Sequence, residues 1–249
     1  MRGVTDSMRP GERQEVVAGE LGRYFREALP GDPGIDAVGC TGGTVVDQLR
    51  RCLERGDLTG RPHVRLRVIV PDFTQPLSGL CRRDGSGTED AVNAVNAVDP
   101  EYPGNAGTPG AGNPGAPGAG NAGPFHGPGD DAELRRELWR EVVGLAHDMA
   151  ALDRRLHSGR RARLDVEFRV LHLTPVVTFC LIDRSQLFDE ARDRGEGRAA
   201  PRPRPAAGRD AVLTRWHVDA GAAARERIRT RGLLFDALWS VARPLTRTG

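Results

Sequence analysis

The chain has 249 residues, which is long enough to bury one sizeable hydrophobic core. Its 36 permanently basic residues are all arginine and are nearly balanced by 34 acidic residues, so the net charge of +2 gives no support for a nucleic-acid partner. The absence of lysine excludes lysine chemistry such as a Schiff base or a P-loop. No stretch approaches the roughly 18 apolar residues that span a bilayer, and no apolar leader is present. We therefore expect a cytoplasmic protein with no membrane partner.

The first third of the chain predicts alternating helices and strands. Apolar residues at helical spacing predict a helix over Glu12–Leu29, and a short apolar run predicts a buried strand at Ile35–Cys40. A Thr-Gly-Gly turn leads into a predicted helix at Thr44–Arg55, and strict alternation predicts a strand at Val64–Val70. Because a strand, helix, strand order requires a crossover, we expect parallel pairing here.

Two segments have compositions that cannot build a core. Residues 84–130 are rich in Gly, Pro, Ala and Asn, and residues 191–209 contain a Pro-Arg-Pro-Arg-Pro run. Such segments bury too little apolar surface to offset the entropy lost on ordering. We expect both to be disordered or mobile insertions into a single α/β domain that spans residues 12–245.

The strongest helical pattern follows the first insertion. Asp130 and Glu133 have the spacing of a capping box, and apolar residues then recur at steps of three and four until Ser158-Gly159. Strict alternation predicts a strand at Leu164–Leu171, and an apolar run predicts a strand covered on both faces at Val176–Ile182.

The last elements complete the predicted sheet. A strand at Val212–Val218 is expected to form a long-looped hairpin with Val176–Asp183, and a helix is predicted over about Ala222–Ala242. The sequence therefore predicts an α/β fold with a mixed, mostly parallel sheet flanked by helices.

The segment Val176–Asp183 resembles a phospholipase-D motif. Members of that superfamily carry H-x-K-x-x-x-x-D at the start of a buried strand, where the histidine attacks phosphorus and the lysine binds the phosphate. Alignment of Asp183 with the aspartate of the motif places Val176 at the histidine and Thr178 at the lysine. Neither replacement can perform that chemistry. The resemblance therefore implies a degenerate, non-catalytic phospholipase-D-like half.

The order of the other segments is similar to phospholipase-D-like effector domains of actinobacterial regulators. The supporting segments are Ile35–Thr44, Val64–Asp72, Leu164–Asp183 and a closing stretch from Phe235 to Pro244. Phospholipase-D folds need two motif halves and only one is visible, so the resemblance implies a homodimer. Such regulators usually carry a helix-turn-helix ahead of this domain, and the single predicted helix before Ile35 leaves no room for one.

The best small-molecule locus is the turn formed by Thr41, Gly42, Gly43 and Thr44. Backbone N–H groups at a helix start favour anions, and the alternative is a plain tight turn capped by a threonine. Asp72 and Asp183 each follow a strand at what we expect to be the same edge of the sheet. The alternative for both is a turn-forming aspartate.

Two histidines offer a replacement for the lost nucleophile. His172 ends one predicted strand and His217 lies in another, and imidazole titrates near neutrality. The alternative is a pair of ordinary, half-exposed histidines. The four cysteines are widely spaced and no zinc signature is present, so we expect neither a metal nor a cofactor.

Three functional hypotheses follow. The first is a non-catalytic ligand-sensing or interaction module of a bacterial regulatory system. Its unknown small-molecule ligand would be bound by the candidate residues Thr41, Gly42, Gly43, Thr44, Asp72, His172, Thr178, Asp183 and His217. The second is a phosphodiesterase or nucleotide-processing enzyme that uses His172 or His217 with Asp183. The third is a protein-binding adaptor.

Overall fold

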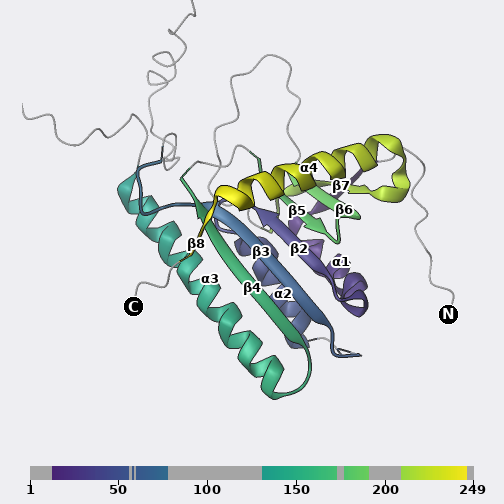
Figure 1. Cartoon of the computed structure of the whole chain (residues 1–249), viewed down its shortest axis with the longest axis horizontal. Coiled ribbons are helices and arrows are strands. Elements are labelled where there is room, and N and C mark those ends of the chain that lie inside the picture. Colours follow the sequence, from purple (N-terminus) through teal and green to yellow (C-terminus); the bar gives the residue numbers. More distant parts are fainter. Residues whose placement is uncertain are drawn as a thin grey trace, which may run out of the picture.

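Eight strands and four α-helices make up the part of the chain that the computed structural model describes, which is residues 13–55, 58, 60–77, 131–172, 177–190 and 209–245 (Figure 1). The strands are β1 (Gln14–Val17), β2 (Gly34–Val38), β3 (His63–Pro71), β4 (Arg163–Leu171), β5 (Phe179–Ile182), β6 (Gln186–Glu190), β7 (Val212–His217) and β8 (Arg243–Pro244). The helices are α1 (Leu21–Ala28), α2 (Gly43–Arg55), α3 (Ala132–Ser158) and α4 (Ala222–Val241). The predicted insertion at 84–130, most of that at 191–209, and Val176 lie outside the described residues.

The strands form one mixed sheet in the order β1-β7-β6-β5-β2-β3-β4-β8. The β2–β3 and β3–β4 pairs are parallel, as the predicted crossovers require, whereas the other five neighbouring pairs are antiparallel. The expected α/β fold with a mixed sheet is therefore confirmed, but the expectation of a mostly parallel sheet is wrong.

The turn between β5 and β6 explains much of this difference. Asp183 and Arg184 both have positive φ, at 51° and 53°, and the Ser185 N–H donates to the Ile182 carbonyl at 3.0 Å. Two successive left-handed residues give a type I′ turn, which joins antiparallel strands tightly. The predicted hairpin between Val176–Asp183 and Val212–Val218 is wrong, because β6 lies between β5 and β7 and pairs with both.

The N-terminal prediction is also corrected. The helix expected over Glu12–Leu29 is replaced in its first part by β1, and only Leu21–Ala28 is α-helical. Residues Gln14–Val17 pair with β7 in an antiparallel register, and Val16 is buried there. A tertiary strand pairing therefore outweighs the local helical spacing of the apolar residues.

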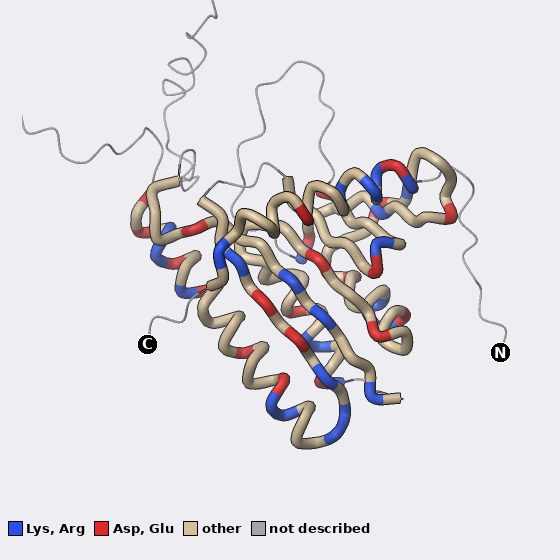
Figure 2. The backbone as a smooth tube through the Cα atoms, in the orientation of Figure 1, with Lys and Arg blue, Asp and Glu red and all other residues tan. Residues whose placement is uncertain are grey.

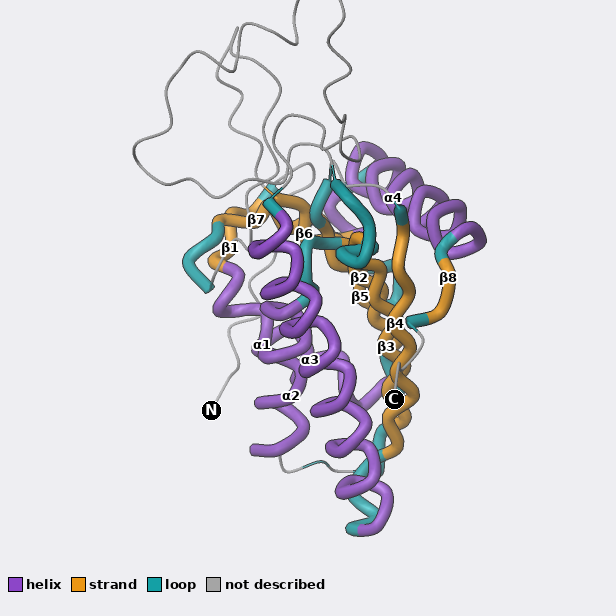
Figure 3. Tube along the Cα trace, turned by 90° about the vertical axis from the view of Figure 1, so that its left-hand side faces the viewer, coloured by secondary structure: helices purple, strands orange, loops and turns teal. Residues whose placement is uncertain are grey.

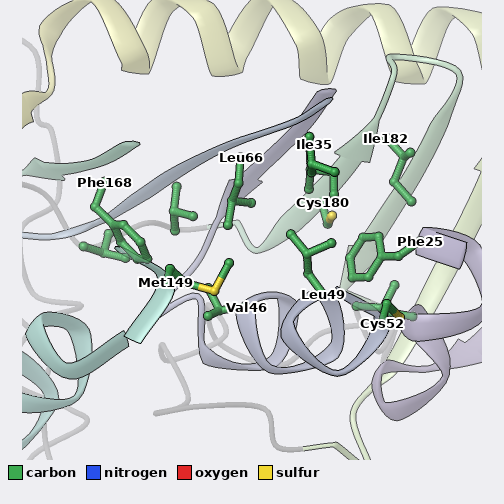
Figure 4. Close-up of a cluster of buried hydrophobic side chains, with 14 of the residues drawn as sticks. Phe25, Ile35, Val46, Leu49, Cys52, Leu66, Met149, Phe168, Cys180 and Ile182 are labelled. Atoms are coloured by element: carbon green, nitrogen blue, oxygen red, sulfur yellow. The ribbon is translucent and has the colours of Figure 1, made fainter. Parts of the chain in front are cut away.

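Helices cover both faces of the sheet. Helices α1, α2 and α3 lie on one face and α4 lies on the other (Figures 1 and 3). Val64, Leu66, Val68 and Val70 are fully buried towards the three-helix layer, and residues such as Leu49 of α2 and Met149 of α3 meet the sheet there (Figure 4).

The opposite face is only partly covered. Charged residues recur along the two strands (Figure 2): β3 carries Arg65 and Arg67, and β4 carries Arg163, Asp165, Glu167 and Arg169. Asp189 of β6 is 2% exposed, and Arg227 and Arg231 of α4 bind its carboxylate at 2.8 and 3.0 Å. In the described ranges, no helix is both long and apolar enough to cross a membrane.

Candidate functional site

A pocket of about 380 Å³ opens at the carboxyl edge of β2, and we call it the β2 pocket. Its walls come from the ends of β2 and β6, the starts of β5, β7 and α2, one position on α1 and two positions on α3. Most of the wall is apolar, with the larger side chains being Leu21, Val38, Leu145, Phe179, Phe188 and Leu213. Phe188 is fully buried and packs against Tyr24, with 4.9 Å between ring centroids, so this wall is also part of the core.

The floor of the β2 pocket is the turn between β2 and α2. Gly42 has φ +73°, and a Cβ atom there would lie 2.7 Å from Cγ1 of Val68, so both backbone and space require glycine. Thr41 is 3% exposed, and its hydroxyl accepts from the Gly43 N–H at 3.2 Å. The threonine-capped turn is therefore present at the start of α2.

The positive end of α2 already has an anion beside it. The Thr41 hydroxyl donates to Oε1 of Glu141 at 2.8 Å, and a Cβ on Gly43 would lie 2.9 Å from the same oxygen. A carboxylate is stabilised near a helix N-terminus by the free N–H groups and the helix dipole. Glu141 therefore occupies the place where the sequence pointed to a bound anion.

The other charged groups of the β2 pocket leave it acidic. Asp47 and Glu190 join Glu141 in the lining, and Arg209 is the basic residue there. Arg209 is bound to Asp47 at 2.8 Å. Burial raises the pKa of Asp47, but hydrogen bonds from Arg209 and Arg50 outweigh it, so this pKa lies below its ordinary value.

Thr178, which the sequence comparison set against the motif lysine, reaches this site. Its Cγ2 atom lies 3.4 Å from the position of a Cβ on Gly39, and its carbonyl accepts from the Glu190 N–H at 3.1 Å. The structure thus brings Thr178 together with Thr41, Gly42, Gly43 and Thr44 in one lining.

Asp72 and His172 lie at the same edge of the sheet but outside the β2 pocket. Asp72 follows β3, is 1% exposed, and binds the Thr74 hydroxyl at 2.6 Å and the Arg243 guanidinium. Burial raises the pKa of Asp72, but these hydrogen bonds outweigh it and lower the value. Its role is to tie the turn after β3 to β8. His172 follows β4 and is exposed.

Asp183 and His217 lie at the opposite edge of the sheet, where β2 and β6 begin. Because β5 is antiparallel to β2, Asp183 accepts from the Gly34 N–H at the beginning of β2, at 2.7 Å. His217 pairs with Gln186 at the same edge, and its Nδ1 accepts from the Asp219 N–H at 3.2 Å. The expectation that Asp72 and Asp183 share an edge is therefore wrong, and neither Asp183 nor His217 lines the β2 pocket.

Asp47 of α2 and three charged lining residues that come from outside the β2–α2 segment were not found from the sequence. Glu141 is one of many acidic residues on α3, Glu190 lies in an unpredicted strand, and Arg209 closes a predicted insertion. None has a local signal, because each reaches the site through tertiary packing. In the described part of the chain, no group of three or more His, Cys, Asp or Glu side chains is placed to hold a metal ion.

Comparison with protein-family models, with curated proteins and with solved structures finds no match to this chain. The resemblance to phospholipase-D-like domains therefore stays a prediction.

Proposed function

We propose that the protein is a non-catalytic ligand-sensing module of a bacterial regulatory system and that its ligand occupies the β2 pocket. The observation that carries this proposal is a pocket of about 380 Å³ in which the Thr41–Thr44 turn and Thr178 meet an apolar wall. Small-molecule sites typically combine a volume of about 300–1,000 Å³ with apolar walls and a few convergent polar groups.

The charged residues of the lining also indicate which kind of ligand the β2 pocket would bind. Glu141 already lies at the start of α2, and Asp47 and Glu190 add further carboxylates. An anionic ligand would meet these charges at close range in a partly desolvated site, which is unfavourable. The preferred ligand is therefore an apolar molecule with a hydrogen-bond donor or a protonated amine, and not a phosphate ester.

The enzymatic alternative has less support. A phosphodiesterase or nucleotide-processing enzyme needs its nucleophile within reach of the bound substrate. His217 belongs to the opposite edge of the sheet and His172 is outside the lining of the β2 pocket. The adaptor alternative rests on α4, where Leu233 and Val241 are 56% and 71% exposed.

A pair of dyes tests the ligand proposal. N-phenylnaphthylamine is apolar and carries one N–H donor, and anilinonaphthalene sulfonate has the same skeleton with an added negative charge. We expect the uncharged dye to become fluorescent on the full chain at stoichiometric concentration and the sulfonated dye to bind at least about tenfold more weakly.

Two variants locate the dye. Thr178→Phe places a ring inside the β2 pocket and should abolish binding of the uncharged dye. Leu233→Ser removes an exposed apolar side chain from α4, far from the β2 pocket, and should leave binding unchanged. Binding that survives in Thr178→Phe and disappears in Leu233→Ser would contradict the proposal.

Two further measurements separate the alternatives. Hydrolysis of bis(p-nitrophenyl) phosphate that is lost in His172→Ala or His217→Ala would support the enzyme. Native mass spectrometry of the purified chain reports a retained small molecule, which supports the sensor. The same spectrum tests the homodimer that the resemblance implies.

A further inference from the structure

A second concave site lies between α1 and α2, with a volume of about 280 Å³, and we call it the arginine hollow. Its lining is formed by Gly19, Gly22, Arg26, Gln48, Arg51, Cys52, Arg55 and Arg209. Four of these residues are arginines, and none is acidic. The arginine hollow therefore has the opposite charge to the β2 pocket.

The helical spacing of the lining residues explains its shape. Gln48, Arg51 and Arg55 lie three and four positions apart and so share one face of α2. Gly22 faces them from α1, and its carbonyl accepts a hydrogen bond from the Cys52 thiol at 3.0 Å. Because Gly22 has no side chain, the two helices approach closely there and leave a cavity beside the contact.

The positive charges of the arginine hollow are only partly neutralised. Asp47 lies 3.5 Å from Arg51 and 2.8 Å from Arg209. Arg26 and Arg55 make no hydrogen bond or ion pair with any described residue. Like charges on neighbouring helical positions repel one another, so this arrangement favours a bound anion.

The side-chain amide of Gln48, which lines the arginine hollow, is a second feature that suits a ligand. Gln48 is only 7% exposed, yet its side chain makes no hydrogen bond in the described part of the chain. Its Oε1 atom faces Gly22, at 2.9 Å from the position of a Cβ there. The amide atoms of Gln48 are not fully buried, so they are open to the arginine hollow, where a ligand oxygen can accept a hydrogen bond from the amide in place of solvent.

We propose that the arginine hollow binds a small anion carrying one or two phosphate groups. Arginine forms planar, two-pronged hydrogen bonds that match phosphate oxygens, and the Gln48 amide adds a donor from the wall. The volume of about 280 Å³ suits a small molecule and not an extended nucleic-acid strand. This site shares Arg209 with the β2 pocket, but its other lining residues are different, so either proposal can fail without the other.

Calorimetric titration of the full chain with inorganic pyrophosphate at low salt tests the proposal. Arg55→Gln should weaken binding about tenfold, because it removes one of the guanidinium groups without a protein partner. Arg154→Gln is the matched control: Arg154 is an exposed helical arginine of α3 that also has no described partner, and its loss changes the net charge equally. Equal weakening in both variants, or no binding by the unaltered chain, would overturn the proposal.

Two substitutions at Gln48 distinguish a binding role from a structural one. Gln48→Leu should weaken pyrophosphate binding while the melting temperature stays the same or rises. Gln48→Glu places a carboxylate among the arginines, so it should raise the melting temperature and abolish binding. If Gln48→Glu binds pyrophosphate as well as the unaltered chain does, the anion is not in the arginine hollow. An oligonucleotide that binds more tightly than pyrophosphate and is insensitive to Arg55→Gln would equally contradict the proposal.

Discussion

The β2 pocket and the arginine hollow lie close together but differ in every property that selects a ligand. The β2 pocket has apolar walls that belong to the core and carboxylates from Asp47, Glu141 and Glu190. The arginine hollow has polar walls between two surface helices and four arginines. One site is therefore suited to an apolar donor and the other to a phosphate, although both lie against α2.

Arg209 connects the two sites. It lines both of them and is bound to Asp47, which lines the β2 pocket. An anion in the arginine hollow would compete with Asp47 for this guanidinium. The net charge of the β2 pocket therefore depends on Arg209, which an anion in the arginine hollow can also bind.

The largest difference that we expect concerns stability. Phe188 is fully buried in the wall of the β2 pocket, so Phe188→Ala should lower the free energy of unfolding by about 3–5 kcal/mol. Arg55→Gln in the arginine hollow should change it by no more than about 0.5 kcal/mol. Denaturant unfolding measures both values. A cost below about 1 kcal/mol for Phe188→Ala would show that the wall is not part of the core.

The next prediction concerns the residue between the two sites. The hydrogen bonds from Arg209 and Arg50 outweigh burial and lower the pKa of Asp47 in the folded protein. A carboxylate with a lowered folded-state pKa stabilises the fold above its unfolded-state pKa, and that contribution is lost as pH falls through the folded value. We expect Asp47→Asn to cost about 1–2 kcal/mol at pH 7 and progressively less below about pH 4.

A double-mutant cycle assigns that cost. Asp47→Asn and Arg209→Gln should couple by about 0.5–1 kcal/mol, and added salt should reduce the coupling because Arg209 is half-exposed. If the loss in the free energy of unfolding caused by Asp47→Asn grows as the pH falls, the ion pair with Arg209 does not lower the pKa of Asp47.

A smaller effect should follow from removal of the charge at the start of α2. Glu141→Gln keeps a hydrogen-bond acceptor for Thr41 but removes the carboxylate beside the helix N-terminus. We expect a loss of about 0.5–1 kcal/mol in the free energy of unfolding. The affinity for anilinonaphthalene sulfonate should rise about fivefold, whereas that for the uncharged dye should stay unchanged. A gain for both dyes would mean that charge does not distinguish the β2 pocket.

Local patterns were enough to predict most elements but not the sheet order. Helices α2 and α3 and strands β3 and β4 follow from periodicity, and α3 begins with Asp131 as its cap, one position after the predicted Asp130. Strand β6 was missed, because only Leu187 and Phe188 mark it as apolar. Its Asp189 is buried through ion pairs with α4, and no local pattern reveals a partner so far along the chain.

The candidate site was predicted in part for the same reason. The rule that ligands gather at the carboxyl ends of parallel strands correctly points to Thr41–Thr44, whereas Thr178 reaches the same place because β5 is antiparallel to β2 and begins there. The rule fails for Asp183, because the direction of β5 is set by its turn into β6. Glu141 and Arg209 are separated from their partners by 100 and 162 residues, and such contacts cannot be read from spacing.

The smallest predicted effect contrasts one polar side chain from each site. Thr41 of the β2 pocket has two hydrogen-bond partners, so the nearly isosteric Thr41→Val should cost about 1 kcal/mol in the free energy of unfolding. Gln48 of the arginine hollow has no described partner and its amide is open to solvent, so Gln48→Leu should change that free energy by no more than about 0.5 kcal/mol. Thermal and denaturant unfolding without added anion measure both changes. A larger loss of stability in Gln48→Leu would show that the amide already serves the fold, and the case for a phosphate in the arginine hollow would then rest on the arginines alone.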